Sequence, residues 1–331
     1  MPSTGASQSR SITGSFGRAS RQEENIIEAA WLYFHNGLNQ GDIAKRLDIS
    51  RASVVNYLAE ARRRDYVRVT LDSDIFRNNQ LAFDLKDRFG LEDALVVPAD
   101  AASESRSIER VVQAASDWLP NFLSPGDQLG IAWGETIYRL AEIAPKLSLN
   151  DVSIVQLIGS KPSDIGFAAE NCAATLAQRF GAKCENLHAP LLLSTPELCE
   201  TLKAEPMIAH QLEMVARCKK TIFAAGTTDN KSHIAMTGLL DHATLAQMRD
   251  KGATGVICGR IIDQNGAPMP APIEDRMIGV SLDQMREKEM GMLVSAGVER
   301  VPAARAAMLG GYVTHLVTCS TSATLILGDL Q

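Results

Sequence analysis

The stretch NQGDIAKRLDISRASVVNYL at residues 39–58 predicts two short helices joined by a tight turn. Asn39 can cap the first helix, and the carboxylate of Asp42 suits the positive end of that helix's dipole. Apolar residues then recur at helical spacing up to the turn at residues 48–49, and Ser50 can cap the second helix. Two capped helices at this spacing are typical of a helix-turn-helix.

The second of these helices carries polar side chains off its apolar stripe of Val54, Leu58 and Ala61. Arginine and asparagine side chains near a helix N-terminus can bond guanine and adenine in the major groove. Further along, the arginines at 62–64 and Arg68 stand where contacts to phosphates are expected. We therefore predict that the helix-turn-helix binds DNA, with the candidates Gln40, Ser50, Arg51, Ala52, Ser53, Asn56, Tyr57, Arg62 and Arg63.

An amphipathic segment upstream predicts a supporting first helix that ends at residues 36–37. Its apolar face would consist of Ile26, Ile27, Ala30, Trp31 and Phe34. Before it, residues 1–20 are rich in Ser, Gly and Thr, so we expect a disordered, weakly basic arm. The expected domains are this arm, a helix-turn-helix (winged-helix-like) domain at 21–72, and a larger domain at 73–331.

Composition and charge describe an ordinary globular protein of two domains. The 331 residues are 45% hydrophobic and 22% charged. The net charge is −6, yet residues 50–68 hold five arginines against two carboxylates, a local charge of +3. We therefore expect DNA contact at one end only. Six cysteines without a C-x-x-C pair suggest reduced, mostly buried thiols of a cytoplasmic protein. No apolar run approaches a membrane span, and no signal-peptide core is evident.

After residue 70 the pattern alternates between helices and short apolar runs. Helical spacing occurs at 79–89, 108–119, 136–143 and 168–180. Strand-like runs occur at 94–97, 128–133, 152–158, 221–225, 255–258, 277–281, 292–295 and 315–318. This alternation predicts a Rossmann-like α/β domain with a parallel sheet wrapped by helices.

Ligands of such sheets bind beyond the carboxyl ends of strands, where helix N-termini present free N–H groups. Junctions at 133–136, 159–161, 226–228 and 296–300 each have a glycine beside polar or basic residues, and 259–263 adds an arginine and a carboxylate. Such groups suit a sugar or its phosphate, although any single glycine could simply serve a loop turn. The candidate effector residues are Trp133, Gly134, Glu135, Thr136, Gly159, Ser160, Lys161, Gly226, Arg260, Asp263, Gly297 and Arg300.

Several ordered motifs support a family resemblance. They are Ala30-Trp-Leu-Tyr33, Gly37-Leu-Asn-Gln40, Ile43-Ala44, Leu47, Ile49-Ser-Arg51, Leu58, Ala61-Arg62, Gly130-Ile-Ala-Trp-Gly-Glu-Thr136, Gly252-Ala-Thr-Gly-Val-Ile-Cys-Gly-Arg-Ile-Ile-Asp263 and Arg276-Met-Ile-Gly-Val280. With these motifs, residues 22–328 resemble the SorC/DeoR type of sugar-responsive bacterial transcriptional regulators. The resemblance implies an effector domain of the sugar-phosphate isomerase and deaminase type, a dimer or tetramer, and DNA binding controlled by a sugar or phosphosugar. It also implies that Trp133, Gly134, Thr136 and Asp263 lie in the effector pocket.

Three positions depart from the family pattern. Arg300 occupies the place of a typical lysine, and Cys319 and Ser320 replace an acidic pair. Arginine still binds an anion, bidentately, but stays protonated and cannot form a Schiff base. These changes leave the effector open, from a polyol to a differently phosphorylated sugar.

Three functions are consistent with the sequence. The first is a ligand-gated transcription factor, a repressor more readily than an activator. The second is a sugar-phosphate isomerase or deaminase with an appended DNA-binding head, for which Glu135 and Asp263 would supply acid-base groups, with His188, His233 or His315 as partners. The third is a large domain that only forms oligomers. No His/Cys/Asp spacing resembles a metal-ligand set, so we expect neither metal nor cofactor.

Overall fold

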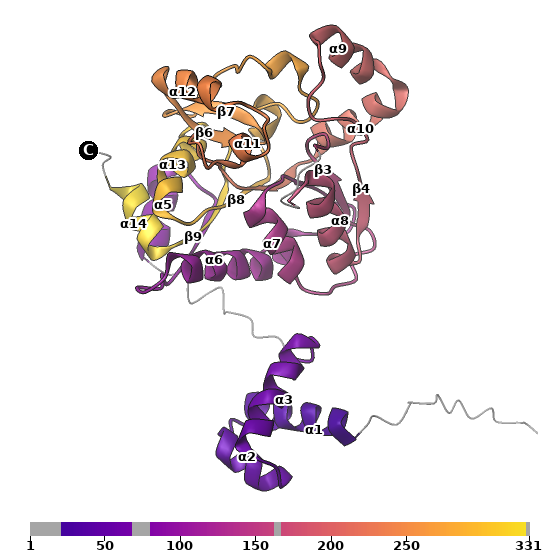
Figure 1. The fold of residues 1–331 in the computed structure, drawn as a ribbon, viewed down its shortest axis with the longest axis vertical. Helices are drawn as coiled ribbons and strands as arrows, with labels where there is room; N and C mark the ends of the chain where they lie inside the picture. The colour runs from indigo at the N-terminus through magenta and orange to yellow at the C-terminus, as the bar shows by residue number, and fades with distance from the viewer. Residues whose placement is uncertain (1–20, 68–79, 162–166, 329–331) are drawn as a thin grey trace, which may run out of the picture. The chain divides into compact units, whose positions relative to one another are not determined.

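The computed structural model describes residues 21–67, 80–161 and 167–328, and the chain divides into two compact units, Met1–Thr70 and Leu71–Gln331 (Figure 1). The first unit contains α1 (Arg21–Ala30), a π-helical turn η1 (Trp31–His35), α2 (Gln40–Leu47) and α3 (Arg51–Arg63). The expected arm at 1–20, and residues 68–72 where a wing would begin, lie outside the described residues.

The predicted caps of α2 and α3 are confirmed. The side chain of Asn39 accepts hydrogen bonds from two amides of the first turn of α2, and its own amide group donates to Asp42 at 2.6 Å. Ser50 Oγ accepts from the amide of Ser53 at 3.0 Å. Between the helices Asp48 adopts a left-handed conformation with φ 53°. These contacts fix the turn, and Ile43, Val54 and other apolar side chains pack between the helices.

The predicted apolar face of the first helix is wrong at two positions. Ile26 is fully buried, but Ile27 is 50% and Trp31 58% exposed. Adjacent helical residues point about 100° apart, so one narrow face cannot bury both isoleucines. At Trp31 the helix also changes to π periodicity, with the amide of Asn36 donating to the carbonyl of Trp31 at 3.2 Å, which turns the indole outward.

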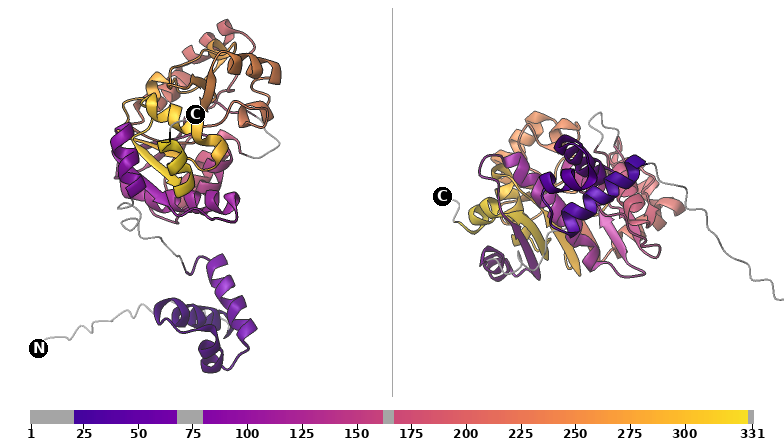
Figure 2. Two further views of the ribbon diagram at one scale, coloured as in Figure 1. Left: turned by 90° about the vertical axis from the view of Figure 1, so that its left-hand side faces the viewer. Right: turned by 90° about the horizontal axis from the view of Figure 1, so that it is seen from below.

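The second unit contains a seven-stranded sheet in the order β1-β9-β8-β5-β2-β3-β4, and every neighbouring pair is parallel. Its strands are β1 (Asp93–Val97), β2 (Gln128–Ile131), β3 (Ser153–Gln156), β4 (Lys183–Glu185), β5 (Lys220–Phe223), β8 (Met290–Val294) and β9 (His315–Cys319). The predicted parallel sheet is therefore confirmed. The first and the last strand of this unit lie side by side, because β1 pairs with β9 (purple and yellow in Figure 2).

Helical layers cover both faces of this sheet. One layer is formed by α6 (Glu104–Trp118), α7 (Glu135–Ile143) and α8 (Ala169–Phe180). The other includes α5 (Gln80–Phe89), α10 (Pro206–Arg217), α12 (His242–Asp250), α13 (Val301–Leu309), α14 (Ser320–Leu327) and the hairpin β6 (Ala253–Ile257)–β7 (Arg260–Asp263). Alternate strand residues serve each layer: Leu95 and Val97 face the first, Ala94 and Val96 the second.

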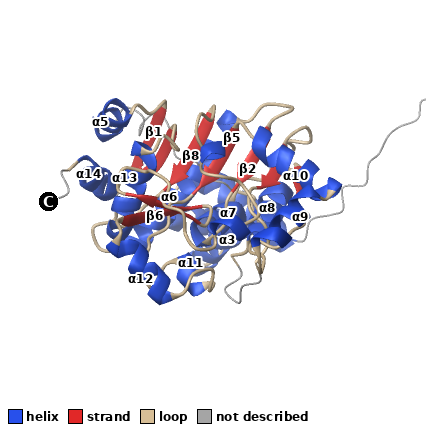
Figure 3. Ribbon diagram, turned by 90° about the horizontal axis from the view of Figure 1, so that it is seen from above, coloured by secondary structure: helices blue, strands red, loops and turns tan. Residues whose placement is uncertain are grey.

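Short elements complete this unit. They are α9 (Pro196–Ala204), α11 (His233–Met236) and the 3₁₀ turns η2 (Leu119–Phe122), η3 (Glu274–Arg276), η4 (Asp283–Met285) and η5 (Val298–Arg300). Figure 3 shows α5 and α14 near one edge of the sheet, and α9 and α10 near the other. No described helix is long and apolar enough to cross a bilayer. All six cysteines are free thiols, and Cys184 alone among them is exposed, in agreement with the sequence.

Two predicted strands need correction. Residues 255–258 belong to the antiparallel hairpin β6–β7 rather than to the parallel sheet. Residues 277–281 form no strand, and they pair only through isolated bridges at Met277 and Gly279. Gly279 has φ +144°, and 3₁₀ turns flank the segment, so the backbone does not continue an extended ladder.

The strand order reverses beside β2. From β2 the chain continues outward to β3 and β4, and then crosses to β5 on the other side of β2, followed by β8 and β9. In parallel sheets the crevice at such a reversal, beyond the carboxyl ends of the strands, is the usual place for a ligand. The loops that follow β2, β5 and β8 therefore define where a binding site is expected.

Candidate functional site

A cavity of about 270 Å³ lies among these loops. It is lined by Ala132, Trp133, Gly134, Glu135, Thr136, Phe167, Ala224, Ala225, Gly226, Thr227, Asp229, Lys231, Ser232, His233, Ile234, Met236, Val256, Cys258, Gly259, Glu299 and Arg300. Its walls come from the loop after β2, the segment before α8, the segment after β5, the hairpin β6–β7 and the turn after β8.

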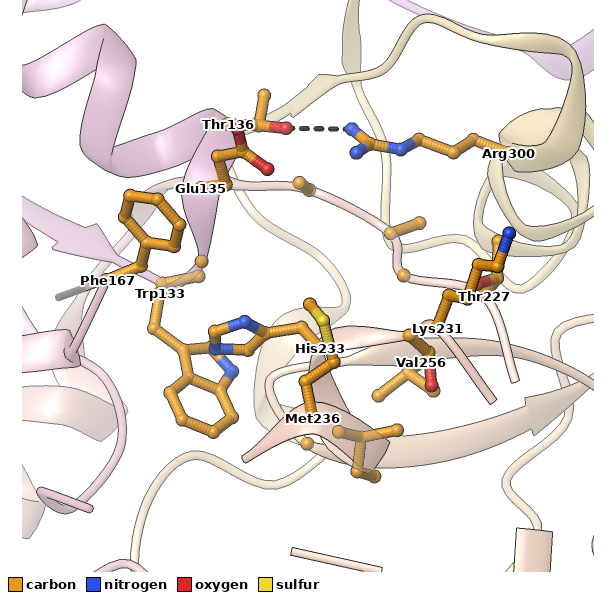
Figure 4. Close-up of a pocket in the computed structure, with 18 of the residues that line it drawn as sticks. Trp133, Glu135, Thr136, Phe167, Thr227, Lys231, His233, Met236, Val256 and Arg300 are labelled. Carbon is orange, nitrogen blue, oxygen red and sulfur yellow. Dashed lines mark hydrogen bonds between the residues drawn. The ribbon is translucent and has the colours of Figure 1, made fainter. Parts of the chain in front are cut away.

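One end of the cavity is suited to an anion. Arg300 Nη1 donates a hydrogen bond to Oγ1 of Thr136 at 2.8 Å, as the dashed line in Figure 4 shows. Thr136 lies in the first turn of α7, which begins after Gly134 at φ +105° and has no side-chain cap. The first amides of a helix have no carbonyl partner within it and carry partial positive charge. A guanidinium and these amides thus converge on one point of the cavity.

The other end is aromatic. The rings of Trp133 and His233 meet edge to face, with centroids 4.4 Å apart and planes at 85° (Figure 4). Nε2 of His233 is buried and has no hydrogen-bond partner in the described part of the chain. Burial lowers the pKa of His233, and the nearby charge of Glu135 opposes that shift only in part. The imidazole at this end is therefore neutral near pH 7.

Carboxylates and a lysine also line the cavity, and Glu135 lies beside Thr136 near Arg300 (Figure 4). Glu135 forms an ion pair with Arg139 at 2.5 Å, on the same face of α7. Asp229 accepts hydrogen bonds from Oγ1 of Thr227 and from the amide of Lys231, each at 2.6 Å, which holds the turn after β5. The exposed Lys231 lies to one side of the cavity in Figure 4. The cavity thus offers both donors and acceptors to a polar ligand.

The structure brings together only half of the candidate effector residues. Trp133, Gly134, Glu135, Thr136, Gly226 and Arg300 line the cavity, whereas Gly159, Ser160, Lys161, Arg260, Asp263 and Gly297 do not. Cavity residues absent from the candidate effector set include Phe167, Lys231, His233 and Met236, of which the sequence offered only His233, and that as an acid-base partner. They stand in loops or in a four-residue helix, where no periodic pattern marks them.

Asp263 and Arg260 have structural partners instead. Asp263 Oδ1 accepts from the amides of Asn265 and Ala267, both at 2.8 Å, and so closes the turn after β7. The buried Arg260 donates from Nε to the carbonyl of Val280 at 2.7 Å and forms an ion pair with Glu274. The expectation that Asp263 shares a pocket with Trp133 is thereby corrected.

The remaining three candidates also lie elsewhere. Gly159 packs so tightly on the backbone of 189–191 that a Cβ atom would not fit, and Ser160 bridges to Pro190. Lys161 lies outside the cavity lining. Gly297 lines a separate cavity of about 320 Å³, next to which Glu104 accepts a hydrogen bond from the amide of Val298 at 2.8 Å.

The first unit presents its own candidate surface on α3. Arg51, Ala52, Asn56, Arg62 and Arg63 are exposed, in line with their expected role. Other candidates have local tasks. The hydroxyls of Ser50 and Ser53 bond to each other at 2.9 Å within the cap, Gln40 Oε1 lies 3.5 Å from Nε of Arg51, and the half-buried Tyr57 packs on the helix core.

The arginines at the end of α3 have different surroundings: Arg62 and Arg63 are exposed, whereas Arg64 is partly buried. Glu60 accepts hydrogen bonds from Arg63 at 2.6 Å and from Arg64, and these bonds hold the pKa of Glu60 at about 2. Arg64 also approaches Glu23 of α1 at 3.3 Å, and Tyr66 bonds the same carboxylate. Arg64 therefore ties α3 to α1.

Comparison with known proteins identifies the family. The model of the "Putative sugar-binding domain" matches residues 73–328. The transcriptional regulator YjhU of Escherichia coli K12 is 31% identical over 310 residues, which cover 92% of this chain and 94% of that protein. The chain belongs to the SorC/DeoR family of transcriptional regulators. A further relative of this SorC/DeoR protein is the deoxyribonucleoside regulator of Bacillus subtilis, which is 26% identical over 94% of this chain and 99% of its own length. Another is the erythritol catabolism regulatory protein EryD of Brucella abortus, which is 24% identical over 94% of this chain and 98% of its own length.

Solved structures of SorC/DeoR regulators share the fold. The full-length sorbitol operon regulator SorC from Klebsiella pneumoniae superimposes with a TM-score of 0.73 at 22% identity, covering 94% of this chain and all of that one. A DeoR-family regulator from Listeria monocytogenes gives 0.70 at 24% identity over 74% of this chain and 98% of that one. The predicted fold class, a helix-turn-helix with an α/β sugar-binding domain, is confirmed.

Proposed function

We propose that the protein is a ligand-gated repressor in which α3 reads double-stranded operator DNA and the cavity binds a sugar, polyol or phosphosugar. The observation that carries this proposal is the contact of Arg300 with Thr136 at the uncapped start of α7. It supplies a charged donor and helix amides at one point, and each of these favours a phosphate group. The aromatic end, at Trp133 and His233, would hold the carbon skeleton.

The names of relatives are compatible with such a ligand. EryD is named for erythritol catabolism, SorC for the sorbitol operon, and the regulator of B. subtilis for deoxyribonucleosides. We infer by analogy that the present chain controls a carbohydrate or polyol catabolic operon in the cytoplasm. The cavity has an end suited to a phosphate, at Arg300, and an aromatic end, at Trp133 and His233. This arrangement favours a phosphorylated acyclic or furanose sugar over an unphosphorylated one.

Gating requires that the effector distinguish two states of the protein. An effector that binds the DNA-incompetent state more tightly shifts the population away from DNA, and by no more than its differential affinity. We also propose a homo-oligomer, a dimer or tetramer, because two α3 helices are needed for a pseudo-palindromic site. Light scattering of the full chain would report that state directly.

Regulation is a better account of the cavity than catalysis. Of the two carboxylates considered for acid-base chemistry, Asp263 closes a turn outside the cavity, and Glu135 is paired with Arg139. The described residues contain no cluster of three His, Cys, Asp or Glu side chains that could hold a metal. A turnover assay with phosphosugars tests this choice, and any product formed above the rate of a boiled control would favour an enzyme.

A thermal-shift screen tests the proposed ligand class. The full chain would be heated with pentitols, tetritols, hexoses and their phosphates. A ligand at 100 times its Kd adds about 2.7 kcal/mol to the free energy of unfolding, which is a readily measured increase in Tm. We expect at least one phosphorylated compound to stabilise the protein more than its parent alcohol. Absence of stabilisation by every compound would instead favour a domain that only forms oligomers.

A further inference from the structure

Val55 is an exposed apolar side chain in the middle of the proposed DNA-reading helix. It is 45% exposed, whereas its neighbour Val54 is fully buried and Leu58 nearly so. A β-branched residue such as valine has a lower helix propensity than alanine. Because Val55 is exposed, its side chain also adds little hydrophobic stabilisation to the free protein. The stability of α3 therefore does not account for a valine at this position.

The surroundings of Val55 form a continuous exposed strip. Successive residues of an α-helix point about 100° apart. On the surface of α3, Ala52 and Ala59 therefore flank Val55 on one side, and Arg51 and Arg62 flank it on the other. All of these residues are exposed and lie outside the buried stripe. The two alanines end in methyl groups, so neither shields Val55 nor keeps the helix away from a surface. The flanking arginines supply positive charge on the same side. The strip is thus shaped for close approach to an anionic surface with an apolar contact at its centre.

Within DNA, one group answers this description. The base edges in the major groove carry donors and acceptors, except for the C5-methyl group of thymine, which is apolar. A valine pressed against a polar edge would remove water from it without offering a hydrogen bond, and that costs free energy. Against a thymine methyl group, both partners lose apolar surface to water.

We propose that Val55 selects a thymine in each half-site by contact with its C5-methyl group. This inference rests on the proposed function, since it presumes that α3 enters the major groove. It adds a hydrophobic contact with a base to the polar base contacts expected from Arg51 and Asn56. Loss of one methyl-sized contact corresponds to about a fourfold change in affinity per half-site.

Deoxyuridine isolates the methyl group, since it differs from thymidine by that group alone. Full-length protein would first select binding duplexes from a random pool. Each thymine of the selected site would then be replaced in turn by uracil. We expect wild type to lose about fourfold in affinity at one position per half-site, and Val55→Ala to bind the two duplexes equally. Val55→Thr, which keeps one methyl group, should retain part of the preference.

Ile27→Ala is the matched control, because Ile27 is a similarly exposed aliphatic residue on α1. It should keep the wild-type response to uracil. Two results would overturn the inference while leaving DNA binding intact: indifference of wild type to uracil at every position, or an undiminished uracil effect in Val55→Ala. If wild type enriches no duplex at all, the proposed function falls together with the inference.

Discussion

The guanidinium of Arg300 is hydrogen-bonded to the hydroxyl of Thr136 at 2.8 Å, which joins the turn after β8 to the first turn of α7. These residues are 164 positions apart in the chain. Both residues line the cavity, and the guanidinium places a positive charge there. The strength and selectivity of effector binding should depend on it.

Replacement of Arg300 by Gln should weaken binding of a phosphorylated effector by roughly 10- to 100-fold, because a hydrogen bond to a charged group contributes about 1.5–3 kcal/mol. The unphosphorylated parent should lose much less. Isothermal titration with both compounds gives the ratio. Arg305→Gln is the control, since Arg305 bonds the carbonyl of Gly328 and does not line the cavity. Equal losses for both ligands would contradict a phosphate role.

Arg51 and Arg63 should affect DNA binding in different ways. Arg51→Ala should weaken the selected operator and relax the base preference at one position. Arg63→Ala should weaken all duplexes about equally and lower the slope of log affinity against log salt by about 1. Titrations at several salt concentrations, with operator and random DNA, measure both. The division fails if both variants relax the base preference to the same extent.

Arg64 should behave as a structural residue despite its place beside Arg63. Its bonds to Glu60 and its approach to Glu23 tie α3 to α1. Arg64→Ala should therefore lower the midpoint of unfolding of the first unit, followed by far-UV circular dichroism, and leave the salt slope near that of wild type. A salt slope reduced as much as in Arg63→Ala would assign Arg64 to the phosphates instead.

His233 should make stability depend on pH. Burial lowers its pKa below the ordinary value of 6.5, so the unfolded chain binds the proton more readily than the folded one. The stabilisation is complete above the pKa of the unfolded histidine and is lost as the pH falls from there through the lowered value. Between pH 7.5 and 5.5, Tm of wild type should fall more steeply than that of His233→Asn. The same change at the exposed His242 controls for loss of an imidazole; parallel curves for wild type and His233→Asn would refute the effect.

Local patterns predicted those parts of the structure that local forces determine. The caps at Asn39 and Ser50 and the parallel strands follow from nearby residues and from periodicity. The prediction of a strand at 277–281 was wrong because an apolar run does not reveal its pairing partners. This segment pairs with its neighbours only through isolated bridges. The prediction that Trp31 is buried was wrong because a π-helical turn changes the direction in which the side chains of a helix point.

The cavity was half predictable for a related reason. Junctions after β2 and β8 could be recognised from glycines beside polar residues, which gave Gly134 and Arg300. His233 enters from a four-residue helix after β5, and only the strand order places it against Trp133. Asp263 was misplaced because the sequence cannot show that the strand expected at 255–258 pairs in the antiparallel hairpin β6–β7 rather than in the parallel sheet.

The most direct test of the central claim is a titration of operator DNA with and without effector, using duplex from the selection and ligand from the thermal-shift screen. For wild type, we predict at least a fivefold weakening of DNA binding by saturating effector, at the lower end of typical coupling energies. Arg300→Gln should bind DNA normally without effector and need roughly 10- to 100-fold more effector for the same response, whereas Asp263→Asn should respond at the wild-type concentration. An unchanged response in Arg300→Gln, or no effect of effector on DNA binding by wild type, would contradict the account.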